Sequence, residues 1–195
     1  MAVTAVVFDV GETLLDETRY WTELADLAGV ERETFFAALD EAIATGDHRR
    51  VWDLVGEPLP DLPPLYEMRD LFPDAPHCLA RLREGGYVVG VAANQPPETE
   101  DLLRRMFPFD LIRVSSLWGV TKPEPEFFER LCEELLQQPE QIAYVGDRVD
   151  NDVLPALAAG MTAVHVRRGR WSRVQNAPPE AIVIDSLEEL PGVFA

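Results

Sequence analysis

The amino-acid sequence predicts an α/β fold, in which a doubly wound parallel sheet carries a small inserted all-helical segment. Short apolar runs rich in β-branched residues recur along the chain, and amphipathic stretches of helical length separate most of them. One long span near the start of the chain has helical spacing but no strand-like run. Apolar strands that alternate with helices are typical of a parallel sheet covered on both faces.

Six runs are predicted to be the strands of this sheet: Val3–Asp9, Tyr87–Ala93, Leu111–Ser115, Ile142–Gly146, Thr162–Val166 and Ile182–Asp185. Four amphipathic stretches are predicted to be its helices: Cys78–Glu84, Glu98–Met106, Glu126–Gln137 and Asp152–Ala159. Parallel strands need crossover connections, and helices of this length supply them. We therefore expect the carboxyl ends of the strands to lie together at one edge.

The span 16–74 is predicted to be a separate helical subdomain. Its apolar residues fall at helical spacing in three groups: Leu24, Leu27 and Ala28; Phe35, Phe36, Leu39 and Ile43; Val51, Trp52 and Val55. Several prolines follow, and Pro64 is expected to open a last short helix that ends near Leu71. The predicted division is an α/β core of residues 1–15 and 75–195 with a helical insertion of residues 16–74.

The composition excludes some classes of function. Among 195 residues, 35 acidic and 17 basic side chains give a formal charge of -18, which repels nucleic-acid phosphates and anionic lipids. We therefore expect neither a nucleic-acid nor a membrane partner, and we interpret the basic run 167–173 as a surface loop. The apolar start is interrupted by Asp9 and has no basic leader, so it predicts a buried strand. Two cysteines without metal-ligand spacing predict a reducing, cytoplasmic location.

Acidic residues follow two of the predicted strands. Asp9 and Gly11 follow the first strand, and three aspartates including Asp147 and Asp152 follow the fourth. Ligands of open α/β sheets bind beyond the carboxyl ends of strands. Asp150 or Asn151 can cap the next helix, but three aspartates exceed that need. Carboxylates this close together call for a cation, and a site rich in oxygen ligands suits Mg²⁺.

Lys122 is the only lysine of the chain and follows the third predicted strand. Its compact ammonium group can act as a point charge for a phosphoryl oxygen or a carboxylate. Pro123 and Pro125 restrict the backbone next to it, so the lysine leaves from a stiff segment. The position and its neighbours indicate a functional residue.

Together these four segments resemble the haloacid dehalogenase superfamily, most of whose members are magnesium-dependent phosphatases, from Val3 to about Val166. The resemblance implies a Rossmann-like core and a helical cap at 16–74 that closes over the site. It implies that Asp9 is the nucleophile that forms an aspartyl-phosphate, and that Lys122 positions the reacting groups. It also implies a small phosphorylated metabolite as substrate and a Mg²⁺ site made of Asp9, the Gly11 carbonyl, Asp147 and Asp152.

Two positions depart from the pattern of the family. Gly11 stands where its phosphatases carry a second aspartate, the general acid and base, whose loss typically costs about 10²–10⁴-fold in rate. Glu12 is a candidate substitute. Ala93 stands where the family has a serine or threonine that binds the phosphoryl group, and Asn94 or backbone amides are expected to compensate there. On sequence alone, Gly11→Asp is expected to raise turnover of substrates with poor leaving groups.

Three functions are compatible with this pattern. The first is a magnesium-dependent phosphatase with weakened acid-base catalysis. The second is a catalytically impaired regulatory protein that still binds magnesium and phosphate, and it is motivated by Gly11 and Ala93 together. The third is a 2-haloacid dehalogenase-type hydrolase, which is considered because those members of the family also lack the second aspartate. It is the least favoured, because they work without magnesium and the aspartates after the fourth strand would then have no cation.

Overall fold

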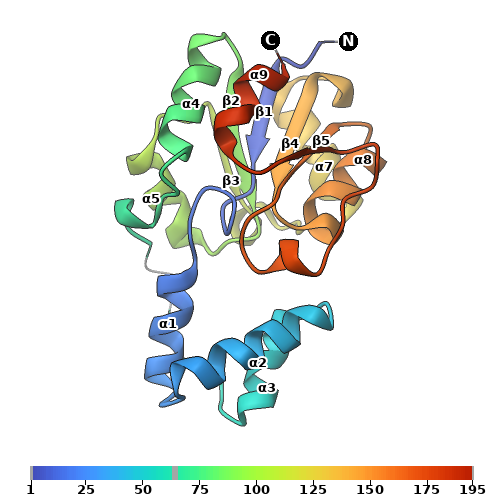
Figure 1. The fold of residues 1–195 in the computed structure, drawn as a ribbon. Helices are drawn as coiled ribbons and strands as arrows, with labels where there is room; N and C mark the ends of the chain where they lie inside the picture. Colours follow the sequence, from blue (N-terminus) through green and yellow to red (C-terminus); the bar gives the residue numbers. More distant parts are fainter. Residues whose placement is uncertain (1, 63–65, 195) are drawn as a thin grey trace.

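The computed structural model describes residues 2–62 and 66–194. All strands are parallel and form one six-stranded sheet in the order β3-β2-β1-β4-β5-β6 (Figure 1). The predicted fold class is confirmed, and the predicted strand ends differ from the observed ones by at most two residues. The strands are β1 Ala5–Phe8, β2 Val88–Ala93, β3 Leu111–Val114, β4 Ile142–Gly146, β5 Thr162–Val166 and β6 Ile182–Ile184.

Helices cover both faces of the sheet because successive side chains of a strand point to opposite sides. In β1, Val6 and Phe8 join one hydrophobic core, while Ala5 and Val7 join the other. The first core is covered by α4 Ala75–Glu84, α5 Pro97–Met106 and α9 Leu190–Val193. The second is covered by α6 Ser115–Trp118, α7 Pro125–Leu135 and α8 Leu154–Ala158.

The helix predicted at Asp152–Ala159 begins with a turn of a different kind. A π-helical turn, η4 Val149–Val153, precedes α8, so Asp152 lies in this turn and not at the start of an α-helix. Pro155 has no backbone N–H and is accommodated in the first turn of α8. The remaining short helices are 3₁₀ segments: η1 His48–Arg50, η2 Met68–Asp70, η3 Pro139–Gln141, η5 Trp171–Arg173 and η6 Leu187–Glu189.

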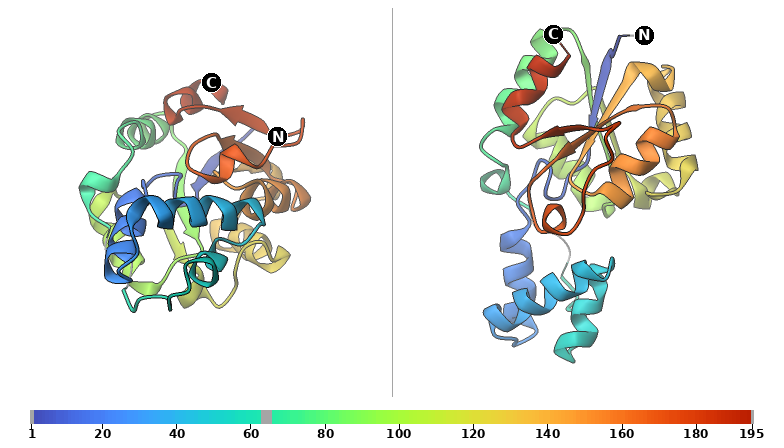
Figure 2. Two further views of the ribbon diagram at one scale, coloured as in Figure 1. Left: turned by 60° about the horizontal axis from the view of Figure 1, so that its bottom comes forward. Right: turned by 45° about the vertical axis from the view of Figure 1, so that its right-hand side comes forward.

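The helices α1 Thr18–Leu27, α2 Arg32–Ala44 and α3 Val51–Val55 lie beyond the carboxyl ends of the strands (Figure 1). In the left view of Figure 2, α2 crosses in front of the sheet. These helices share a small core of their own that includes Phe35, Leu39 and Val51. Trp171, from the loop after β5, completes that core. The helix expected to begin at Pro64 starts outside the described residues.

The chain leaves the sheet and returns to it at one place. Leu15 forms a bridge with Leu71, so the two connections to the helical segment lie side by side. Within the described residues, no helix has the length and apolar character needed to cross a membrane.

Candidate active site

The acidic cluster lies where the strand order reverses. β1 and β4 are neighbours in the middle of the sheet, and the connections from them run in opposite directions, which opens a crevice at their carboxyl ends. Asp9 follows β1, whereas Asp147 and Asp152 follow β4. One carboxylate oxygen from each of the three lies within 4.8 Å of the others. The structure therefore brings together the carboxylates that the strand ends predicted.

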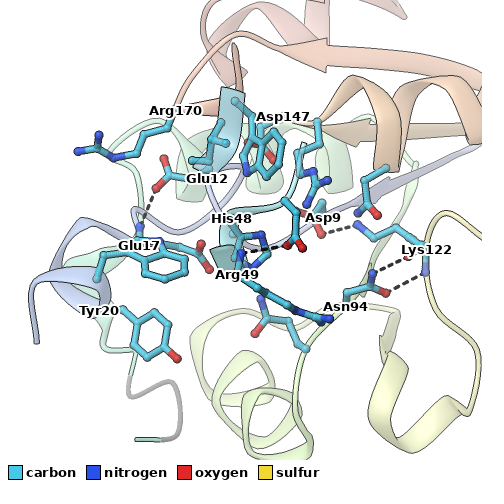
Figure 3. Close-up of a pocket in the computed structure, with 18 of the residues that line it drawn as sticks. Asp9, Glu12, Glu17, Tyr20, His48, Arg49, Asn94, Lys122, Asp147 and Arg170 are labelled. Carbon is cyan, nitrogen blue, oxygen red and sulfur yellow. Dashed lines mark hydrogen bonds and ion pairs between the residues drawn. The ribbon is translucent and has the colours of Figure 1, made fainter. Parts of the chain in front are cut away.

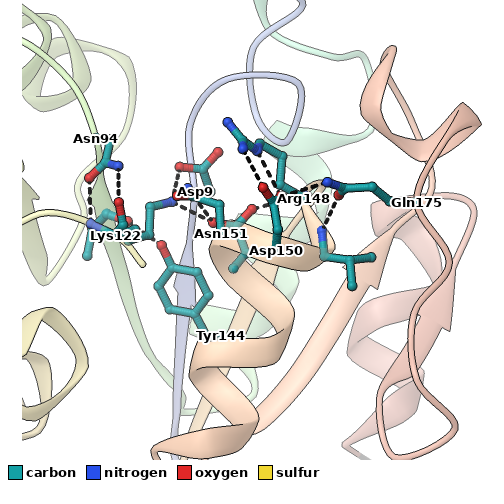
Figure 4. Close-up of polar contacts among 11 residues, drawn as sticks. Asp9, Asn94, Lys122, Tyr144, Arg148, Asp150, Asn151 and Gln175 are labelled. Carbon is teal, nitrogen blue, oxygen red and sulfur yellow. Dashed lines mark hydrogen bonds and ion pairs between the residues drawn. The ribbon is translucent and has the colours of Figure 1, made fainter. Parts of the chain in front are cut away.

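Lys122 lies between two of these carboxylates (Figure 4). Its Nζ donates to Asp9 Oδ1 at 2.5 Å and to Asp152 Oδ1 at 2.6 Å, and its side chain is fully buried. The side chain of Asn94 forms two hydrogen bonds with the backbone of Lys122. Its Oδ1 accepts from Lys122 N at 2.9 Å and its Nδ2 donates to Lys122 O at 2.8 Å. The lysine is thus positioned at both its backbone and its ammonium group.

Asp152 is held tightly, whereas Asp147 keeps an unused oxygen. Asp152 Oδ2 accepts from Arg148 N at 3.0 Å. A Cβ atom at Gly146 would lie 2.3 Å from the same oxygen, so this approach requires glycine. Asp147 Oδ2 is buried and has no hydrogen-bond partner among the residues that the structure describes. A buried, unpartnered carboxylate oxygen is the donor that a metal ion would use.

The electrostatics of the cluster favour a bound cation. Burial raises the pKa of Asp147 well above its usual range, and the nearby Asp152 and Asp9 raise it further. The pKa of Asp152 rises to about 6 through burial, although Lys122 opposes that shift. Burial lowers the pKa of Lys122, but Asp152 and Asp9 outweigh burial and hold it well above its usual value. One ammonium group faces three carboxylates, so the cluster can bind a metal ion.

The third aspartate after β4 does not belong to this cluster. Asp150 pairs with Arg148 at 2.7 Å and accepts from Gln175 Nε2 at 2.7 Å (Figure 4). Neither Asp150 nor Asn151 caps the following helix, because the π-helical turn has no side-chain cap. Instead, the carboxylate of Asp152 accepts a hydrogen bond from the backbone N–H of Arg148.

A cavity of about 540 Å³ opens above the cluster and extends to the helices α1–α3 (Figure 3). Asp9, Gly11, Asn94, Lys122 and Asp147 line it at the strand ends. Basic and aromatic residues line the rest of its wall: Tyr20, Trp21, His48, Arg49, Trp52, Arg148, Arg170 and Trp171. Ala93 is fully buried at the end of β2 and does not line the cavity.

Sequence reasoning missed the loop after β5, which it interpreted only as a basic surface loop. Arg170 forms an ion pair with Asp40 of α2, and its guanidinium lies 4.4 Å from the ring centre of Phe36. Trp171 is 7% exposed and packs into the core of the helical segment. This loop therefore joins the helices to the sheet. The unusual Arg-Trp pair within a basic run was the only sequence signal of this contact.

Two glutamates also line the cavity, and burial is the main cause of an unusual pKa in each. Burial raises the pKa of Glu12 to about 8, with a further contribution from Glu17. Burial raises the pKa of Glu17 to about 7, and the nearby Asp9 adds to this shift. Sequence analysis considered Glu12 and overlooked Glu17.

Comparison with known proteins identifies the family. The family model of haloacid dehalogenase-like hydrolases matches residues 3–160, so the chain belongs to this family of hydrolases. It is 28% identical to a glyceraldehyde 3-phosphate phosphatase of Methanopyrus kandleri, over 89% of this chain and 88% of the relative. It is 33% identical to a phosphoserine phosphatase of Thermus thermophilus, over 60% of this chain and 49% of the relative.

Solved structures agree with this assignment. A phosphatase of the family from Thermococcus onnurineus superimposes with a TM-score of 0.65 at 25% identity, covering 99% of this chain and 97% of that one. The magnesium-bound hydrolase YfnB of Bacillus subtilis gives a TM-score of 0.75 at 20% identity, covering 100% and 99%. The second likeness supports the fold alone. The family predicted by the sequence motifs is confirmed.

Proposed function

We propose that this hydrolase is a magnesium-dependent phosphatase that cleaves a small phosphate ester through an aspartyl-phosphate on Asp9. One observation carries the proposal. Asp9 lines the cavity and belongs to the cluster of three carboxylates, and Lys122 Nζ donates a hydrogen bond to Asp9 Oδ1 at 2.5 Å. Curated relatives named as phosphatases of small phosphorylated metabolites support the same reaction class.

The proposed roles follow from the contacts of each residue. Lys122 bonds Asp9 Oδ1, which leaves the other oxygen to attack phosphorus. Asp9, Asp147, the carbonyl of Gly11 and Asp152 would hold Mg²⁺, and the unpartnered Asp147 Oδ2 fits that use. When bound, Mg²⁺ offsets negative charge on the carboxylate and on the phosphoryl group.

The helical segment 16–74 is proposed to act as a cap that selects the substrate and excludes water. Three arginines, Arg49, Arg148 and Arg170, line the cavity beside the acidic floor and suit a substrate with anionic groups. The volume of about 540 Å³ suits a small metabolite. Cys78 and Cys132 are free thiols, which supports the proposed cytoplasmic location.

The proposal is tested by a phosphatase panel with Mg²⁺ and with EDTA, with Asp9→Asn as the matched blank. The substrates are an activated aryl phosphate and a set of small phosphorylated metabolites. We expect phosphate release that requires Mg²⁺ and is lost in Asp9→Asn. Release that is unchanged by EDTA, or retained in Asp9→Asn, would exclude this mechanism.

The alternative is a regulatory protein that binds magnesium and phosphate. It is motivated by the carboxylate that is absent at Gly11 and the hydroxyl that is absent at Ala93. It predicts that calorimetry detects Mg²⁺ binding while no member of the panel is turned over efficiently.

The dehalogenase alternative predicts chloride release from a 2-haloacid in EDTA. The cluster of Asp9, Asp147 and Asp152 disfavours that third reading, because one lysine does not balance three carboxylates when no metal ion is bound.

A further inference from the structure

Gly11 lacks a side chain, but the space that a side chain would occupy is filled. A Cβ atom built on Gly11 would lie 2.5 Å from Oε1 and 2.7 Å from Cδ of Glu17. Real Cβ atoms do not approach other atoms this closely, so the carboxyl group of Glu17 lies where a residue at position 11 would project. Position 11 is where phosphatases resembling this chain carry their second aspartate.

A tight turn after β1 produces this placement. The amides of Leu14 and Leu15 both donate to Val10 O, at 2.9 Å and 3.0 Å, and Leu15 forms a bridge with Gly11. The chain therefore doubles back on itself. Glu17, two residues further on and just before α1, returns to the side of Gly11.

Glu17 is oriented toward the cavity and is not neutralised by a basic residue. The hydroxyl of Tyr66 donates to Glu17 Oε1 at 2.5 Å, and Tyr66 is itself 5% exposed. Among the described residues, no arginine or lysine forms an ion pair with Glu17. Glu17 and Asp9 line the same cavity, as Figure 3 shows. Its carboxyl group is thus held by Tyr66, has no basic partner among the described residues, and shares the cavity with the proposed nucleophile.

Glu12, the candidate suggested by sequence, is placed differently. Its carboxyl group accepts from Glu17 N at 3.3 Å. It also packs against the loop after β5, because a Cβ at Gly169 would lie 2.6 Å from Glu12 Oε2. This carboxyl group is directed at the backbone around it, whereas that of Glu17 occupies the position next to Gly11.

We propose that Glu17 is the general acid and base that Gly11 cannot supply, an inference that rests on the proposed phosphatase function. As Asp9 bonds to phosphorus and the bond from phosphorus to the leaving oxygen breaks, Glu17 gives its proton to that oxygen. A water molecule then attacks the phosphorus of the aspartyl-phosphate, the bond between phosphorus and Asp9 breaks, and Glu17 takes a proton from the water. The sum of the two steps is hydrolysis of the ester.

The first test is the dependence on the leaving group in Glu17→Gln, which keeps the shape of the side chain and the acceptor for Tyr66. Turnover of an alkyl phosphate is expected to fall by about 10²–10⁴-fold. With an activated aryl phosphate, the first release of the alcohol is expected to stay fast, because that group leaves without a proton. Phosphoryl label on Asp9 is then expected to accumulate, since the second step lacks its base. An equal loss on both substrates, without accumulation of label, would overturn the proposal.

Two matched variants accompany this test. Glu23→Gln removes a carboxylate of α1 that lies outside the cavity and pairs with Arg19 at 2.6 Å, and it is expected to behave like the wild type. Glu12→Gln removes the competing carboxylate. If Glu12→Gln shows the leaving-group effect and Glu17→Gln does not, the assignment to Glu17 is wrong.

The second test exchanges the two positions and uses stability as well as activity. Gly11→Asp alone is expected to lower the melting temperature and the turnover, because its side chain would displace the carboxyl group of Glu17 from its hydrogen bond with Tyr66. This replaces the expectation that the single change raises turnover. In Gly11→Asp with Glu17→Ala, the melting temperature is expected to recover and alkyl phosphate turnover to rise at least about tenfold above Glu17→Ala. Additive effects of the two changes on both readouts would contradict the inference.

Failure of this inference and failure of the proposed function give different results. If Asp9→Asn retains activity, the phosphatase mechanism itself is wrong. If Asp9→Asn is inactive, while Glu17→Gln slows the first release of the alcohol equally for all leaving groups and accumulates no label, the mechanism stands and only the role of Glu17 is refuted.

Discussion

Replacing Lys122 by methionine probes the charge balance of the site. Its ammonium group is fully buried and lies 2.5 Å and 2.6 Å from oxygens of Asp9 and Asp152. Methionine keeps an unbranched stem but removes the charge, so three clustered carboxylates lose their counter-charge. Breaking a buried pair by removing one partner costs about 3–5 kcal/mol. In a chain of this size, this corresponds to a fall of roughly 6–20 °C in melting temperature.

The assay is urea unfolding in EDTA at neutral pH, followed by circular dichroism. The matched control is Arg113→Met, which breaks a half-exposed pair of the same 2.6 Å separation with Glu134 and is expected to cost at most about 1 kcal/mol. Mg²⁺ at about 100 times its dissociation constant stabilises by about 2.7 kcal/mol, so adding it should recover much of the loss in Lys122→Met. The reasoning is refuted if Lys122→Met is no less stable than Arg113→Met.

Three further predictions concern the metal cluster, the buried glutamates and the loop after β5. Asp147→Asn is expected to raise the melting temperature in EDTA, because one of the repelling carboxylates is neutralised, and to abolish the rise caused by Mg²⁺ in the wild type; a thermal scan in each condition checks both. Burial raises the pKa of Glu12 from 4.5 to about 8 and that of Glu17 from 4.5 to about 7, so the folded state binds these protons more tightly than the unfolded chain. In EDTA, stability should therefore fall as pH rises from 5 to about 8, and urea midpoints for Glu12→Gln should fall less steeply than those of the wild type. Arg170→Ala removes a partly exposed pair with Asp40 and is expected to cost at most about 1 kcal/mol, yet to raise KM at least severalfold by loosening the helices over the cavity; steady-state kinetics beside urea unfolding separates the two effects.

The sheet could be predicted because its strands are short and apolar, and the two at its centre are fully buried. Ala5–Phe8 and Ile142–Gly146 are buried at every position, and such runs leave little choice of structure. The convergence of Asp9, Asp147 and Lys122 then followed from topology, since parallel strands place their carboxyl ends at one edge. No side-chain geometry was needed for that inference.

The role of the residues around the cluster could not be predicted in the same way. The sequence singled out Asp147 and Asp152 as metal ligands and offered Asp150 as a helix cap. It could not show that the π-helical turn directs Asp152 toward Lys122 and Asp150 toward Arg148. The proximity of Glu17 to Gly11 depends on how one turn doubles back. Periodicity and spacing carry no information about such a turn.

Contacts between distant segments were equally hidden. Arg170 and Trp171 meet the helical segment across about 130 residues of sequence, and composition alone gave them the properties of a solvated loop. Asn94 was expected to compensate for the hydroxyl absent at Ala93, yet its side chain bonds the backbone of Lys122 at both N and O. The side-chain amide of Asn94 therefore also positions the backbone of Lys122, which one sequence cannot reveal.

The most direct test of the central claim is to trap the phosphoryl group on the enzyme. The wild-type protein is mixed with a radiolabelled phosphate ester and Mg²⁺, quenched in acid within one turnover and digested, and the labelled peptide is identified. The account predicts label on Asp9 that is absent in Asp9→Asn and is not formed in EDTA. Turnover without label on Asp9, or label on another residue, would contradict it.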